Sequence, residues 1–108
     1  MLHAFAGSPE IIRELLPLGA WFSFSASVTR PDNHRVHRAV RETPPDRLLI
    51  ETDSPDFLPA SISDRTQPNE PANLPLVLQS VATLRGASPE SLAALTTANA
   101  TRFLTTRI

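Results

Sequence analysis

The sequence predicts an α/β fold with parallel strands in a single domain. Three observations support this prediction. Segments with the pattern of strands and of helices alternate along the chain, the strand at residues 47–53 is apolar on both faces, and two helices begin with Ser-Pro-Glu. Strands that alternate with helices are joined by right-handed crossovers, which make neighbouring strands parallel. A strand apolar on both faces is typical of a sheet covered by helices.

The first half of the chain predicts strand, helix, strand, helix. Residues 1–5 form the stub of a strand and run into a helix over residues 8–19, which has a serine N-cap and a glycine stop. Phenylalanine and serine then alternate between two faces over residues 20–28, which indicates a strand. A helix follows at about residues 33–43 and ends at the proline pair at 44–45.

The second half predicts one more strand and two closing helices. The strand covers residues 47–53, and the proline-rich segment 56–71 is a loop. One helix carries apolar residues from Leu74 to Leu84, and the last helix opens at Ser88. The order is therefore β-α-β-α-β-α-α. Because the first strand has almost no residues before His3, we expect the chain to be a piece of a larger fold.

Composition restricts the classes of function. The chain has 108 residues, a formal net charge of −1 and no cysteine, which excludes disulfides and thiolate zinc sites. It lacks the basic excess that usually marks nucleic-acid binding. The apolar runs are too short to span a bilayer, and residues 1–7 do not form a signal peptide, so a cytoplasmic location is expected.

Two carboxylates mark the end of the third strand. Alternation places Glu51 and Asp53 on one face, with their Cα atoms roughly 6.5–7 Å apart. Functional groups in parallel α/β folds lie at the carboxyl ends of strands, and a buried carboxylate pair is unfavourable unless a cation compensates it. A divalent metal would do so. The alternative is that Asp53 only caps the following turn.

Histidine could complete such a site. His3 lies at the end of the first strand, and imidazole is a common metal ligand, although a single histidine is more often an ordinary packed or surface residue. His34 and His37 share a helix with several arginines, which indicates a solvated basic face or, as the alternative, a phosphate contact. Asn73 can cap the following helix.

Four segments resemble motifs of the TatD-type deoxyribonucleases. They are His-Ala-Phe-Ala-Gly-Ser at 3–8, Glu-Thr-Asp-Ser-Pro at 51–55 with Phe-Leu-Pro at 57–59, Asn-Glu-Pro at 69–71, and Thr-Ala-Asn-Ala at 97–100 with Phe103. The resemblance covers nearly the whole chain in order. It implies a TIM-type (β/α)8 barrel that hydrolyses DNA phosphodiester bonds with divalent metal ions.

By this resemblance, His3 and Asp53 are metal ligands, and Asp53 is also the catalytic residue that accepts a proton from the attacking water. Glu51 is expected to support the site by orienting ligands or water. The implied cofactor is a divalent ion, Mg²⁺ in the first place, with Mn²⁺ or Zn²⁺ as alternatives. DNA is the implied substrate. The family's basic residue before Asn-Glu-Pro is replaced here by Gln67-Pro68, which weakens a phosphate contact there.

A complete barrel takes roughly 250 residues, so residues 1–108 are expected to form its C-terminal part, about the last three βα units and a closing helix. The family's other metal ligands would precede Met1. Because two ligands do not hold a catalytic metal, the isolated chain is expected to be inactive. An open three-stranded sheet would expose the apolar face around Leu49 and favour a missing N-terminal half or self-association. The alternatives are an inactive truncated fragment, or a related hydrolase of amides or lactones.

Overall fold

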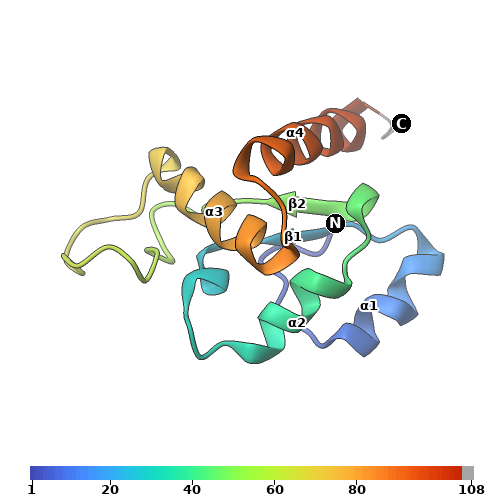
Figure 1. Cartoon of the computed structure of the whole chain (residues 1–108), viewed down its shortest axis with the longest axis horizontal. Coiled ribbons are helices and arrows are strands. Elements are labelled where there is room, and N and C mark those ends of the chain that lie inside the picture. The colour runs from blue at the N-terminus through green and yellow to red at the C-terminus, as the bar shows by residue number, and fades with distance from the viewer. Residues whose placement is uncertain (106–108) are drawn as a thin grey trace.

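A computed structural model of the chain describes residues 1–105, and Figure 1 shows the predicted alternation of helices and strands. The α-helices and strands are α1 (Pro9–Leu15), β1 (Phe22–Phe24), α2 (His34–Glu42), β2 (Leu48–Ile50), α3 (Leu74–Arg85) and α4 (Pro89–Thr105). Short 3-10 helices connect them: η1 (Leu16–Leu18), η2 (Ala26–Thr29), η3 (Pro45–Arg47) and η4 (Pro71–Asn73).

The two strands pair in parallel, as predicted, with Ser23 opposite Leu49. The predicted first strand is reduced to one bridge, in which Leu2 pairs in parallel with Phe22. The chain turns away directly afterwards, because Ala4 adopts a positive φ of 46°. The predicted three-stranded sheet is therefore two strands with a single bridge at one edge.

Both strands are shorter than predicted. The alternation of residues 20–28 continues beyond β1, yet the amide of Val28 donates to the carbonyl of Ser25 at 3.2 Å and turns the chain into η2. The expected strand 47–53 is limited to Leu48–Ile50, because η3 precedes it and Asp53 has a left-handed φ of 58°. Local hydrogen bonds and turns replace strand pairing at these ends.

The core forms where the helices pack on the aromatic side of β1. Phe22 and Phe24 are fully buried, and the ring of Phe5 lies edge-on to Phe22 with centroids 5.0 Å apart. The predicted apolar stripe of α2 is also buried, as Val36 and Ala39 show. This core places the amino-terminal segment that carries His3 beside β1.

Leu49 itself is buried, at 6% exposure, although the face around it was expected to be exposed. Helix α4 packs against β2, and Phe103 of α4 lines a cavity together with Leu49 and the exposed apolar residues Met1 and Leu104. The buried side-chain amide of Asn99 holds α4 against β2 by donating to the carbonyls of Pro45 at 2.7 Å and Leu48 at 2.8 Å. Figure 1 shows α4 running beside β2.

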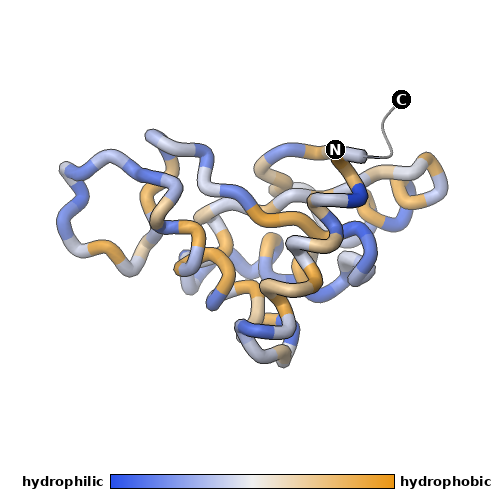
Figure 2. The backbone as a smooth tube through the Cα atoms, turned by 90° about the horizontal axis from the view of Figure 1, so that it is seen from above, coloured by the Kyte–Doolittle hydropathy of each residue, from blue (hydrophilic) through white to orange (hydrophobic). Residues whose placement is uncertain are grey.

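The long connection from β2 to α3 extends away from both chain ends, and its tip is hydrophilic (Figure 2). It begins with the Glu-Thr-Asp-Ser-Pro segment, directly after β2. Within residues 1–105, every helix falls short of the length or the hydrophobicity that crossing a bilayer requires.

Candidate metal centre

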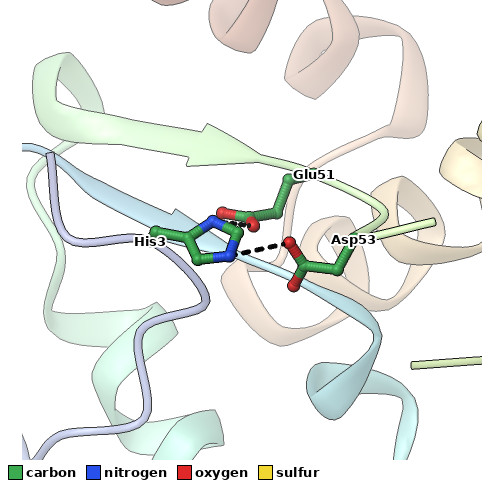
Figure 3. Close-up of side chains that lie close together, drawn as sticks. All are labelled: His3, Glu51 and Asp53. Carbon is green, nitrogen blue, oxygen red and sulfur yellow. Dashed lines mark ion pairs between the residues drawn. The ribbon is translucent and has the colours of Figure 1, made fainter. Parts of the chain in front are cut away.

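Three side chains that the sequence singles out meet beside the two strands (Figure 3). Nδ1 of His3 lies 2.5 Å from Oε1 of Glu51, and Nε2 of His3 lies 3.0 Å from Oδ1 of Asp53. One ligand atom from each residue lies within 4.8 Å of the others, and no other such group of three occurs within residues 1–105. The structure thus brings together every residue assigned to the predicted site.

Backbone pairing and two turns position these side chains. The Leu2 bridge holds His3 beside β1, and the amide of Glu51 donates to the carbonyl of Phe24 at 2.9 Å, which extends the strand pairing by one residue. Asp53 adopts a φ of 58°, a conformation that aspartate accepts more readily than most residues. This turn brings the Asp53 carboxylate to His3, beyond the end of β2 at Ile50.

Burial makes this cluster electrostatically unusual. The side chains of Glu51 and Asp53 are only 16% and 8% exposed, whereas that of His3 is 64% exposed. Within residues 1–105, Oε1 of Glu51 and Oδ2 of Asp53 are buried without a hydrogen-bond partner. Unpaired buried oxygens of this kind are costly, and a cation would satisfy both. The residues therefore fit a divalent metal.

The donor types agree with that fit. One imidazole nitrogen and two carboxylates suit Mg²⁺, Mn²⁺ or Zn²⁺, and the sequence contains no thiolate ligand. The second oxygen of Glu51, Oε2, accepts a hydrogen bond from the amide of Ala4 at 3.1 Å. This bond fixes the orientation of the Glu51 carboxylate, whose other oxygen, Oε1, faces Nδ1 of His3.

The two carboxylates differ in their affinity for protons. Burial, together with the adjacent Glu51 carboxylate, raises the pKa of Asp53 to about 6, against the opposing influence of His3 and Ser25. Burial also acts to raise the pKa of Glu51, but interactions with Asp53, Ser23 and the Ala4 amide outweigh it and lower that pKa. Asp53 is therefore the carboxylate of the pair that takes up a proton first as the pH falls.

Two serines also belong to this site, although they were not predicted from the sequence. Ser23 and Ser25 are each 2% exposed and interact with Glu51 and Asp53 respectively. The available signal was the serine face of the strand at 20–28, opposite its phenylalanines. Polar residues on a buried strand face indicate that a polar group lies against them.

The alternative role of Asp53 as a turn cap is not what the structure shows. Its carboxylate faces His3, and the hydroxyl of Thr52 accepts the local hydrogen bonds, from the amide of Ser54 at 3.4 Å and from its hydroxyl at 3.0 Å. The peptide bond before Pro55 is cis. Asp53 is thus available to the cluster.

The loop after the cluster is organised by Asn69, another residue that the sequence analysis left without a role. Its buried side-chain amide donates to the carbonyls of Thr52 at 2.7 Å and Asp56 at 2.9 Å. The expected capping role of Asn73 is wrong, because its side chain donates to Asn69 at 2.9 Å and does not cap α3.

The other histidines lie elsewhere. His34 is exposed on α2, and Nε2 of His37 lies 3.1 Å from the carbonyl oxygen of Val28. Neither belongs to the cluster of His3, Glu51 and Asp53, which opens onto a cavity of about 590 Å³.

A parallel α/β unit with a histidine and two carboxylates beside its strand ends is the arrangement of a metal-binding α/β protein. The chain belongs to the TatD-related DNase family, whose model matches residues 1–105.

Curated relatives agree with this assignment. The uncharacterized metal-dependent hydrolase YabD of Bacillus subtilis (strain 168) is 37% identical over 103 residues, which are 95% of this chain and 40% of YabD. The 3'-5' ssDNA/RNA exonuclease TatD of Citrobacter rodentium is 39% identical over 109 residues, again covering 95% of this chain and 40% of the relative. The chain thus spans about two fifths of the length of these relatives.

Solved structures show the same architecture. The crystal structure of YJJV, a TatD homologue from Escherichia coli K12, matches with a TM-score of 0.80 and 26% identity, over 91% of this chain and 37% of that one. A TatD-family hydrolase from Entamoeba histolytica matches with a TM-score of 0.75 at 19% identity, over 94% of this chain and 40% of that one, and shows the fold alone.

Proposed function

We propose that this chain is part of a metal-dependent nuclease of the TatD type, which cleaves DNA phosphodiester bonds with metal-activated water. In this proposal, residues 1–108 form the C-terminal part of a TIM-type barrel, about three βα units and a closing helix. The observation that carries it is the cluster of His3, Glu51 and Asp53, in which two buried carboxylate oxygens have no hydrogen bond.

Each residue has a distinct task in this proposal. His3 and Asp53 bind the ion, and Glu51, held by the amide of Ala4, keeps the ligands oriented. When bound, a divalent ion supplies the Lewis acidity that makes water a better nucleophile and offsets phosphate charge. Asp53 accepts the proton of the attacking water, for which Oδ2 has no competing hydrogen bond.

The choice of nucleic acid as substrate rests on relatives. The Citrobacter relative is named as a 3'-5' ssDNA/RNA exonuclease, and the matching family model is described as TatD-related DNase. YabD and other relatives are named only as metal-dependent hydrolases. A hydrolase of amides or lactones is therefore the second candidate for the substrate class.

The length of the relatives bears on activity. Because this chain covers 40% of YabD, the residues that it does not match would supply further ligands. We expect the 108-residue chain alone to bind metal without turnover, because a catalytic metal needs more protein ligands than His3 and Asp53. Its natural partner would be the remainder of the barrel or a second copy.

A chimera tests this function. The chain is joined to the part of YabD that it does not match, and degradation of single-stranded DNA is followed with Mg²⁺, Mn²⁺ or Zn²⁺. We expect degradation by the chimera, none by its Asp53→Asn variant, and none by the isolated chain. A folded, metal-loaded chimera that spares DNA but cleaves an amide or lactone would reject the nuclease assignment.

A further inference from the structure

A second cavity lies next to the metal cluster, between η2 and the loop that follows β2. Its volume is about 580 Å³, and its lining comprises Ala26, Ser27, Arg30, Phe57, Leu58, Ala60 and Arg65. The amide of Ala60 donates to the hydroxyl of Thr29 at 2.9 Å, which fixes the loop against η2. The cavity is therefore formed entirely by residues of this chain.

Phe57 is held in this cavity wall by an ordered loop. Phe57 is 59% exposed, and its φ of 59° is left-handed, a conformation that is uncommon for a bulky residue. The side-chain amide of Asn69 donates to the carbonyl of Phe57 at 3.3 Å, and the guanidinium of Arg65 donates to the carbonyls of Leu58 and Pro59. An aromatic ring kept in water by such constraints is available to stack on a ligand.

The charge of the cavity is positive. Arg30 is exposed, and its guanidinium has no hydrogen bond or ion pair within the described residues. Arg65 adds a second cation, and no acidic residue lines the cavity. Asp64, in the loop that lines the cavity, accepts hydrogen bonds from Thr66 and Gln67 within its own turn. The cavity therefore favours an anionic ligand.

The cavity lies close to the metal cluster. The amide of Asp56 donates to the carbonyl of Asp53 at 2.9 Å, so a single tight turn separates Asp53 from Phe57. A strand of nucleic acid bound at the cluster would reach the cavity with an adjoining nucleotide.

We propose that this cavity binds an unpaired nucleotide of a single-stranded nucleic acid, with its base stacked on Phe57 and its phosphate contacted by Arg30. The proposal extends the proposed nuclease function by naming how the strand is recognised. An unpaired nucleotide offers an exposed base face at every position, whereas a duplex offers one only at its ends or after unstacking, so the subsite favours single strands. DNA and RNA share the base and phosphate that it uses.

Binding is measured with the 108-residue chain in EDTA, which separates recognition from hydrolysis. The probes are DNA and RNA oligonucleotides of one sequence containing 2-aminopurine, whose fluorescence falls when the base stacks. We expect quenching and binding in wild type, roughly tenfold weaker binding without quenching in Phe57→Ala, and restored quenching in Phe57→Trp. Duplex DNA should bind more weakly than single strands.

Arg30 is tested by salt dependence. Arg30→Gln should reduce the slope of log affinity against log salt by about 0.7, the value of one phosphate contact to a single strand. Arg35→Gln is the matched control, because Arg35 is an exposed arginine of α2 that does not line the cavity. It should keep the wild-type slope.

Several results would overturn the proposal. They are equal affinity of wild type and Phe57→Ala, equal slopes for Arg30→Gln and wild type, or a Phe57-dependent dimer that excludes the oligonucleotide. Preference for DNA or for RNA would identify the natural strand, and either preference supports the subsite. If binding depends on Phe57 but the chimera never cleaves DNA, the subsite stands and the nuclease function fails.

Discussion

Nε2 of His3 lies 3.0 Å from Oδ1 of Asp53, although neither residue belongs to a regular strand. His3 follows the Leu2 bridge and precedes Ala4, which has a positive φ. Asp53 follows the pairing of Glu51 with Phe24 and itself has a positive φ. The site is thus assembled by two turns at the same end of the parallel pairing. Changes to these turns, or to the charges that they hold, should have measurable effects.

The buried charge of Asp53 should make the metal-free chain less stable above pH 6. Its pKa is about 6 in the folded chain against 3.8 ordinarily, so the folded state binds the proton more tightly and loses stability as the pH rises from about 4 to 6. Asp53→Asn removes the charge and keeps a residue that tolerates positive φ. In EDTA we expect the variant to be more stable by about 1–2 kcal/mol at pH 8.

Urea denaturation at pH 4 to 8 measures this effect, and the advantage of Asp53→Asn should decline towards pH 4. The lowered pKa of Glu51 contributes stability above about pH 4.5, which is lost only as the pH falls through its folded pKa. The two effects therefore occupy different pH ranges. A stability difference that is constant across the range would contradict the assignment of the shift to Asp53.

Replacing Gly7 with alanine should destabilise the fold. A Cβ there would lie 2.6 Å from Cζ of Phe5, whose ring is buried and packed edge-on against Phe22 and Phe24. Because the ring cannot move away freely, Gly7→Ala should lower the free energy of unfolding by about 1–3 kcal/mol. In a Phe5→Leu background the same change should cost clearly less. Additive losses in the double variant would show that Phe5 is not the cause.

Asn69→Ala should loosen the loop without unfolding the core. The variant loses the hydrogen bonds to the carbonyls of Thr52, Asp56 and Phe57, and these carbonyl oxygens lose the donor that Asn69 supplies. Hydrogen exchange should accelerate in residues 54–68 and stay unchanged in α2. Gln67→Ala is the control, because that exposed side chain bonds only to Asp64. Uniform acceleration along the chain would refute a local role.

The sequence was sufficient for the order of the helices and of β1 and β2, and for the three residues of the cluster, but the first predicted strand is only the Leu2 bridge. Helix stops, proline pairs and apolar stripes are local signals, and the buried residues Val36 and Ala39 follow the predicted stripe. The ends of β1 and β2 were predicted wrongly, because alternation cannot reveal that Ser25 starts a turn or that Asp53 is left-handed.

Long-range polar contacts were also beyond the sequence. Asn69 and Asn99 each satisfy backbone carbonyls of a distant segment, at Thr52 and Leu48 for example, and nothing in their neighbouring residues indicates this. The burial of Leu49 depends on where α4 packs, which periodicity alone does not determine. Tertiary packing decided each of these features.

The binding of a divalent ion by His3 and Asp53 is tested most directly by titrating Mn²⁺ into the 108-residue chain by calorimetry. We expect one ion per chain, and binding at least about tenfold weaker in His3→Ala and in Asp53→Asn. Asp46→Asn is the control, because Asp46 is an exposed carboxylate outside the cluster, and its affinity should match wild type. Mn²⁺ affinity that is unchanged in both His3→Ala and Asp53→Asn would contradict the metal centre.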